Sequence, residues 1–355
     1  MRNKENIQTL LQDLRSASDK EIHFDEEAII AAYEEKNTNH QSLAIKILSI
    51  FGGIMACLAF LGFIFLAQIF DSQAGLIILG IICIAGSSYF SRLSKKTITD
   101  TLSVSFFITG FALLGFGLSQ KGDIIYLIFI VLALCALFLA QSYILSFISV
   151  LIINGAIIAF AADNNMHSLP YIIIALQALA TTFLFLQEAK IITKNRTFAT
   201  LYDPVRTGMV FSFLFTLAFL SLENLVAISV FYNYISSAVI IIAILYVVTL
   251  LFKTLHVTNT MHKAIMYVLT IALLLPTLLT PSISGAILII LLSFLVNYRT
   301  GFVLGIIALI YFIGKFYYDL HFTLLTKSIL LFVSGIIFLV IYFFTHKKLT
   351  ANEKI

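Results

Sequence analysis

The chain has 355 residues, of which 60% are hydrophobic and 11% charged, and its formal net charge is +4. A typical soluble domain carries about 25% charged residues. This composition excludes a water-soluble protein over most of the length and indicates a polytopic membrane protein. The three cysteines, Cys57, Cys83 and Cys135, each lie within an apolar run, so they predict neither a disulfide framework nor a metal site.

Residues 1–43 form a polar N-terminal segment with five basic and nine acidic residues. An apolar stripe at helical spacing predicts an amphipathic helix, formed by Ile7, Leu10, Leu11 and Leu14. A second helix is predicted after Asp25, whose side chain suits an N-cap. We expect two short cytoplasmic helices that lie against the inner face of the membrane domain. The alternative is a partner-docking or regulatory element.

Residues 44–346 predict an all-α transmembrane bundle of about twelve spans, and residues 347–355 a cytoplasmic tail. A helix rises 1.5 Å per residue, so a hydrocarbon core of about 30 Å needs about 20 apolar residues. The predicted spans are 45–70, 74–90, 101–118, 124–140, 143–162, 171–186, 208–222, 235–252, 264–280, 282–296, 301–316 and 322–344.

The basic residues test this topology independently of hydropathy. With both termini in the cytoplasm, nineteen of them lie on the inner side, and only Lys121, Lys315 and Lys327 lie on the outer side. This asymmetry follows the positive-inside rule for a cytoplasmic membrane. Because the basic residues flank the spans, membrane topology accounts for them and no nucleic-acid partner is expected.

Two long apolar regions allow more than one span count. Residues 124–162 are predicted as two spans with a turn at Gln141 and Ser142, because a single span would make the charge distribution even. Residues 264–296 are either two spans or one span kinked at Pro276 and Pro281. A continuous helix there would be about 50 Å long, far beyond the hydrocarbon thickness.

Polar residues are rare near the centres of the spans. Asn154 and Gln177 are predicted to hydrogen-bond each other across a helix pair. Such a bond is a common structural contact between membrane helices and contributes about 1 kcal/mol. Gly301 and Gly305 form one small-xxx-small step. In a large bundle this step indicates an internal helix contact more often than dimerisation.

One cluster near the outer end of the eleventh span contains more charged and tyrosine side chains than other short segments of the membrane domain. It consists of Lys315, Tyr317, Tyr318, Asp319 and, at the start of the next span, Lys327. Lys315 and Asp319 are four residues apart, so their side chains face each other on a helix. The cluster either fixes the outer hairpin or binds an anionic group or relays protons. We favour the structural interpretation, since interface ion pairs need no ligand.

No other part of the sequence resembles a catalytic constellation. There is no zinc-protease motif, no phosphate-cradling glycine loop and no nucleophile with a base at a recognisable spacing. We therefore expect that the protein is not an enzyme, and we predict no catalytic residues, cofactor or metal.

The two ends of the membrane domain resemble a known family. The tail from Tyr317 to Ser328 with Gly335, and the opening from Ser49 to Phe65, are similar to the bacterial multi-pass membrane family called domain of unknown function 4401. The resemblance implies a bacterial cytoplasmic (inner) membrane protein. It also implies a membrane-anchored companion protein with a GDYxxLxY motif as a partner, besides the lipid bilayer. The chain differs from the tryptophan-rich composition associated with this family, because it has no Trp.

Two functional classes follow. The first is a non-enzymatic integral scaffold that assembles with another envelope protein. The alternative is a secondary transporter of a small, mostly uncharged solute, because twelve spans and a central basic loop at 187–207 copy the two-half layout of carriers. The core lacks a charged substrate site, which favours the scaffold.

Overall fold

The computed structural model describes residues 72–93, 97–140, 142–166, 168–222, 230–255 and 260–319, together with separate positions between 52 and 66 and between 325 and 339. Regular structure in these ranges is helical. The chain divides into two compact units, Met1–Leu113 and Leu114–Ile355. The predicted N-terminal helices and C-terminal tail lie outside the described residues.

The first unit contains α4 (Gln73–Leu93) and most of α5 (Thr97–Leu118). The two helices approach closely at Gly110, where a Cβ atom would lie 2.7 Å from Ile84 Cγ1 and 2.9 Å from the Gly80 carbonyl oxygen. A small apolar core surrounds this crossing, made of Ile64, Leu76, Cys83 and Leu113. Such close backbone approach supplies the van der Waals packing that associates helices in lipid.

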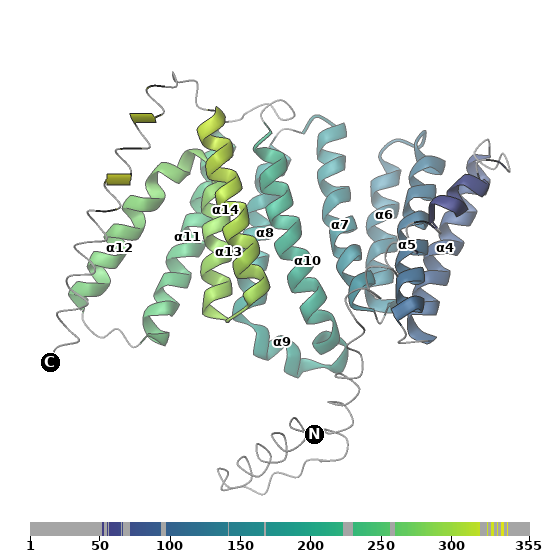
Figure 1. Ribbon diagram of the computed structural model, residues 1–355, viewed down its shortest axis with the longest axis horizontal. Helices are drawn as coiled ribbons and strands as arrows, with labels where there is room; N and C mark the ends of the chain where they lie inside the picture. Colours follow the sequence, from purple (N-terminus) through teal and green to yellow (C-terminus); the bar gives the residue numbers. More distant parts are fainter. Residues whose placement is uncertain are drawn as a thin grey trace, which may run out of the picture. The chain divides into compact units, whose positions relative to one another are not determined.

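The second unit is a larger bundle of helices that lie side by side, with the short α9 across one end (Figure 1). Its elements are α6 (Ile124–Leu139), α7 (Tyr143–Asp163), α8 (Leu169–Leu186), α9 (Glu188–Lys194), α10 (Arg196–Leu220), α11 (Val230–Thr254), α12 (Thr260–Leu274), the 3-10 helix η2 (Leu275–Leu279), α13 (Pro281–Leu295) and α14 (Arg299–Asp319).

Seven of the described helices are long and apolar enough to cross a membrane, as expected of an integral membrane protein. Three further apolar helices are shorter: Ile124–Leu139, Lys263–Leu279 and Pro281–Leu295. The described helices coincide with the second to eleventh predicted spans, whereas most of the first and last spans lie outside the described residues. The total of twelve spans therefore stays a prediction.

The apolar run at 124–162 forms two helices, as predicted. α6 ends at Leu139, and the backbone is extended at Ala140 (ψ 138°) and again at Ser142 (ψ 134°) before α7 begins. Extended residues on both sides of the break interrupt the helical hydrogen-bond ladder and let α7 turn back along α6.

The run at 264–296 is also broken. The α-helical segment ends at Leu274, a 3-10 turn containing Pro276 follows, and Thr280 (φ −136°, ψ 83°) separates it from α13. Pro276 has no N–H for the helical ladder, so the α-helix ends before it. Pro281 then occupies the first turn of α13, where a missing N–H costs no hydrogen bond.

Contacts with α11 show that α12 and α13 run in opposite directions. Tyr267 in the middle of α12 lies 2.9 Å from Thr249 near the end of α11, measured between the two hydroxyl oxygens. At the other end, Asn233 near the start of α11 donates to the Leu279 carbonyl. α13 begins at that same end, since Ser282 donates to the Leu217 carbonyl near the end of α10. The structure therefore supports the two-helix interpretation of 264–296.

The central segment 187–207 was predicted as a loop, and this prediction was wrong. Residues Glu188–Lys194 form α9, and α10 begins at Arg196, twelve residues before the predicted span. The segment does not need to be a solvated loop because its most buried charge, Arg206, is paired with the more exposed carboxylates of Asp203 and Glu188.

The glycine step on α14 makes an internal contact, as predicted. A Cβ atom on Gly301 would lie 2.5 Å from Ser293 Oγ, and one on Gly305 would lie 2.7 Å from Ile290 Cγ1, both on α13. The opposite face of α14 carries Ile307 and Ile310, which are 59% and 67% exposed. α14 therefore packs against α13 through its small residues and presents large apolar residues to lipid.

Candidate functional site

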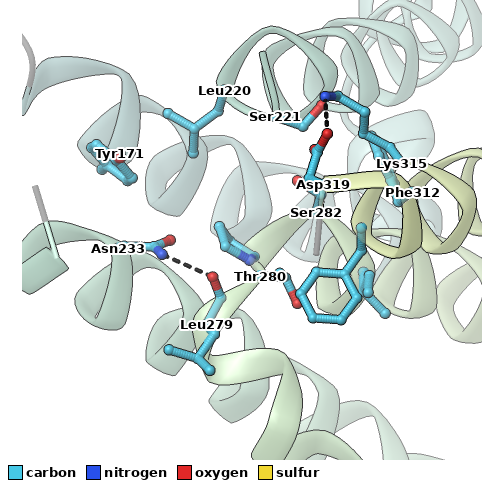
Figure 2. A pocket seen from close by; sticks show the side chains of 13 residues that line it. Tyr171, Leu220, Ser221, Asn233, Leu279, Thr280, Ser282, Phe312, Lys315 and Asp319 are labelled. Carbon is cyan, nitrogen blue, oxygen red and sulfur yellow. Dashed lines mark hydrogen bonds and ion pairs between the residues drawn. The ribbon is translucent and has the colours of Figure 1, made fainter. Parts of the chain in front are cut away.

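A cavity of about 210 Å³ opens at one end of the second unit. We call it the end pocket (Figure 2). It is formed where α8 and α11 begin, where α10 and α14 end, and where η2 meets α13. Its walls are Tyr171, Leu220, Ser221, Asn233, residues 279–283, Phe312, Lys315, Phe316 and Asp319.

The end pocket contains two members of the predicted outer cluster. Lys315 Nζ lies 2.7 Å from Asp319 Oδ1, and the two side chains are 25% and 22% exposed (Figure 2). The predicted i,i+4 ion pair is thus confirmed. Tyr317 and Tyr318 do not line the pocket, and Tyr318 is 80% exposed. Lys327, predicted to reach back to Asp319, lies outside the described residues.

Asp319→Asn should lower the free energy of unfolding by about 1 kcal/mol, because it leaves the partly buried Lys315 ammonium without its carboxylate. Adding Lys315→Gln should restore part of this loss, since the cation that has lost the Asp319 carboxylate is then also removed. Reversible unfolding in mixed micelles measures all three proteins. Equal stability of the wild type and both variants would contradict a structural role for the pair.

Asn233 was not predicted as a pocket residue. Its Nδ2 donates to the Leu279 carbonyl at 2.9 Å, while its Oδ1 is buried and has no hydrogen-bond partner among the described residues (Figure 2). A buried acceptor without a donor costs about 1–3 kcal/mol. The end pocket is therefore suited to a group that donates a hydrogen bond, such as a hydroxyl or an amide.

The predicted amide pair is also present. Gln177 Nε2 on α8 donates to Asn154 Oδ1 on α7 at 2.9 Å, and Asn154 Nδ2 donates to the Val150 carbonyl at 2.9 Å. Gln177 is buried, and its Oε1 has no partner. One donor and one acceptor fix the two helices relative to each other, which is the structural role expected for such a pair.

Asn154→Leu should destabilise the protein by about 1 kcal/mol, and more than Gln177→Leu does. The first change leaves the buried Gln177 amide with both ends unpaired, whereas the second removes an oxygen that already lacks a donor. Unfolding in mixed micelles and a double-mutant cycle with both changes measure the coupling. A larger loss for Gln177→Leu would contradict this account of the pair.

At the opposite end of the second unit, Arg206 is enclosed by charges and rings. It is 8% exposed, and its Nη2 and Nη1 lie 2.7 Å from Asp203 and 3.4 Å from Glu188. Three rings lie near its guanidinium carbon, at 4.1, 4.9 and 5.9 Å from their centroids: Tyr298, Tyr202 and Phe185. We call these six residues the arginine cluster. It joins α8, α9, α10 and the turn before α14.

A hydroxyl junction lies beside the arginine cluster. Thr207 Oγ1 donates to the Asp203 carbonyl at 2.8 Å and accepts from the Tyr143 hydroxyl at 2.9 Å. Tyr298 Oη lies 2.8 Å from the same oxygen. A threonine hydroxyl has one proton, so Tyr298 donates to Thr207 whenever that proton is given to the Asp203 carbonyl. The junction connects α7, α10 and the turn before α14.

In the sequence, Arg206 is one of the basic residues of the predicted central loop at 187–207. The signal that could have identified it is the Asp203–Arg206 spacing of three residues within a helix. Its aromatic neighbours come from as far along the chain as Tyr298, and no local pattern connects them. Within the described ranges, no three His, Cys, Asp or Glu side chains gather as metal ligands.

Comparison with known proteins gives one match. The family described as "Domain of unknown function (DUF4401)" matches residues 42–348. No curated protein and no solved structure matches the chain.

Proposed function

Because this chain belongs to the DUF4401 family, a family described without an activity, we propose its function from the end pocket and the core. We propose that it is a non-enzymatic membrane scaffold that holds a companion envelope protein at the end pocket. The companion inserts a hydrogen-bond donor toward Asn233 Oδ1. The membrane-anchored partner implied by the family resemblance is the first candidate.

The observation that carries this proposal is the filled core below the pocket. On α10, Leu220 beside the end pocket comes fourteen residues after Arg206 of the arginine cluster, a rise of about 21 Å. Side chains with no exposed surface occupy this interval: Phe213, Leu217, Leu288, Ile289 and Leu292. A pocket that ends above buried side chains, mostly apolar with single serine and threonine hydroxyls, supports binding at one end more than passage through the bundle.

The packing of the predicted halves also supports a scaffold. In the carrier layout, α7 and α8 belong to the first half and α10, α11 and α13 to the second. Yet α7 packs against α10, α8 packs against α11 and α13, and the hydroxyl of Tyr143 on α7 donates to Thr207 on α10. Rocking of one half against the other would break these contacts.

Transport of a small, mostly uncharged solute is the second candidate. It is favoured by the size and the polar groups of the end pocket, which suit a small solute with a hydrogen-bond donor. This function would require an open state in which the apolar core below the pocket separates.

Affinity purification of the full chain from its native membranes tests the scaffold. Ser221→Trp fills the pocket from the end of α10, and Leu222→Trp is the matched control because Leu222 is exposed and does not line the pocket. A companion in constant ratio should be retained by the wild type and by Leu222→Trp, and lost with Ser221→Trp. Retention by all three proteins would contradict the pocket as the docking site. Absence of any companion, together with solute uptake by the wild type, would favour transport.

We further propose that the protein lies in a bacterial cytoplasmic membrane with both termini inside and the end pocket outside. The support is the charge asymmetry of the sequence. Reporter fusions after Asp163 and after Arg196 should therefore report opposite sides of the membrane. A result that places both fusions on one side would contradict this topology.

A further inference from the structure

A second cavity, of about 460 Å³, lies at the end of the bundle that carries the arginine cluster. We call it the α9 groove because Lys190, Ile191 and Lys194 of the short helix α9 line it. Figure 1 shows α9 across this end of the bundle. The ends of α6 and α8 and the start of α10 form its apolar walls. Among the residues that line it are Leu137, Phe138, Phe183, Leu201 and Val205.

Two exposed lysines on α9 complete the lining of the groove. Lys190 and Lys194 are four residues apart, so they lie on one face of the helix, about 6 Å apart along its axis. Lys194 Nζ lies 5.7 Å from the centre of the Phe198 ring, which also lines the groove. Glu188, the acidic residue of α9, is engaged with Arg206. The edge of the groove therefore carries positive charge beside an apolar interior.

We propose that the α9 groove binds one anionic phospholipid of the surrounding leaflet. The acyl chain lies against Phe138, Phe183 and Val205, and the phosphate lies between Lys190 and Lys194. Basic side chains beside an apolar groove at the end of a helix bundle match the two parts of such a lipid, its charge and its chain. The apolar interior distinguishes this occupant from a free phosphate ion.

The charge part of the proposal is tested with purified full-length protein and fluorescent phosphatidylglycerol in detergent, with phosphatidylcholine as the neutral lipid. Lys190→Gln combined with Lys194→Gln should weaken phosphatidylglycerol binding on the order of tenfold. Lys253→Gln combined with Lys263→Gln is the matched control. It removes the same charge from α11 and α12 outside the groove, and binding should stay within about twofold of the wild type.

The chain part is tested with Val205→Phe, which narrows the groove from α10. It should lower the affinity for phosphatidylglycerol while the lysines remain, and added salt should weaken wild-type binding more than binding by the double lysine variant. Unchanged phosphatidylglycerol affinity in the double lysine variant would overturn the proposal. Equally tight binding of phosphatidylcholine by the wild type would do the same. Both lysines are exposed, so their replacement leaves the packing of the bundle intact.

Discussion

Arg206→Met is expected to lower the free energy of unfolding by about 2–4 kcal/mol, the largest loss for any single polar side chain described above. Methionine replaces the apolar stem of arginine but removes the cation from two carboxylates and three aromatic rings. The expected loss is below that of a fully buried pair, because Asp203 and Glu188 are 64% and 33% exposed and regain water. Reversible unfolding in mixed micelles measures it.

Two further variants separate the charge from its geometry. Arg206→Lys keeps the cation but lacks the planar fork that reaches two carboxylates at once, so an intermediate loss is expected. Arg196→Met is the matched control, because Arg196 begins the same helix and is exposed. Its effect should stay within about 0.5 kcal/mol. Similar losses for Arg206→Met and Arg196→Met would show that the arginine cluster does not stabilise the bundle.

Gly305→Ala is expected to destabilise the protein by about 1–3 kcal/mol, although alanine is the better helix former. The added methyl group would lie 2.7 Å from Ile290 Cγ1 and 3.2 Å from the Ile290 backbone nitrogen. The side-chain atom can move, but the backbone of α13 has to shift as a whole. α14 must therefore separate from α13. Unfolding in mixed micelles and the yield of monodisperse protein both report this change.

Gly314→Ala provides the control within the same helix. A Cβ atom at this position meets nothing within 4 Å. The substitution should be neutral or stabilise the protein by up to about 1 kcal/mol, because alanine loses less backbone entropy than glycine in a helix. Similar destabilisation by both substitutions would show that helix propensity rather than the α13–α14 contact governs the effect.

Interactions that depend on spacing along one helix, or on two polar groups in an otherwise apolar region, could be predicted from the sequence. The Lys315–Asp319 pair follows from an i,i+4 spacing. The Asn154–Gln177 bond follows from the scarcity of other partners at that depth. The break near residue 140 follows from the charge asymmetry. Near residue 280, proline chemistry indicates an interruption but leaves two spans and one kinked span as alternatives.

Features that depend on the packing of distant segments could not be predicted. Arg206 resembles any basic residue next to a span until Tyr298, 92 positions later, is placed against it. In the sequence, Asn233 resembles any amide at the edge of a span. Its role depends on the carbonyl of Leu279, the last residue of η2, to which it donates. The start of α10 predicted from hydropathy is also too late in the sequence. The first turns of this helix are polar, although Leu201, Tyr202 and Arg206 are buried. A local sequence pattern cannot indicate which polar residues will be buried by tertiary contacts.

The hydroxyl junction has a consequence for proton conduction. A proton wire needs groups that can each accept a proton on one side and release one on the other. When the single proton of Thr207 is given to the carbonyl of Asp203, both tyrosines at the junction donate to Thr207. A peptide carbonyl has no proton to pass on. In this orientation the chain of hydrogen bonds ends at the backbone, so a proton passes between the two tyrosines only after the Thr207 hydroxyl turns away from the Asp203 carbonyl.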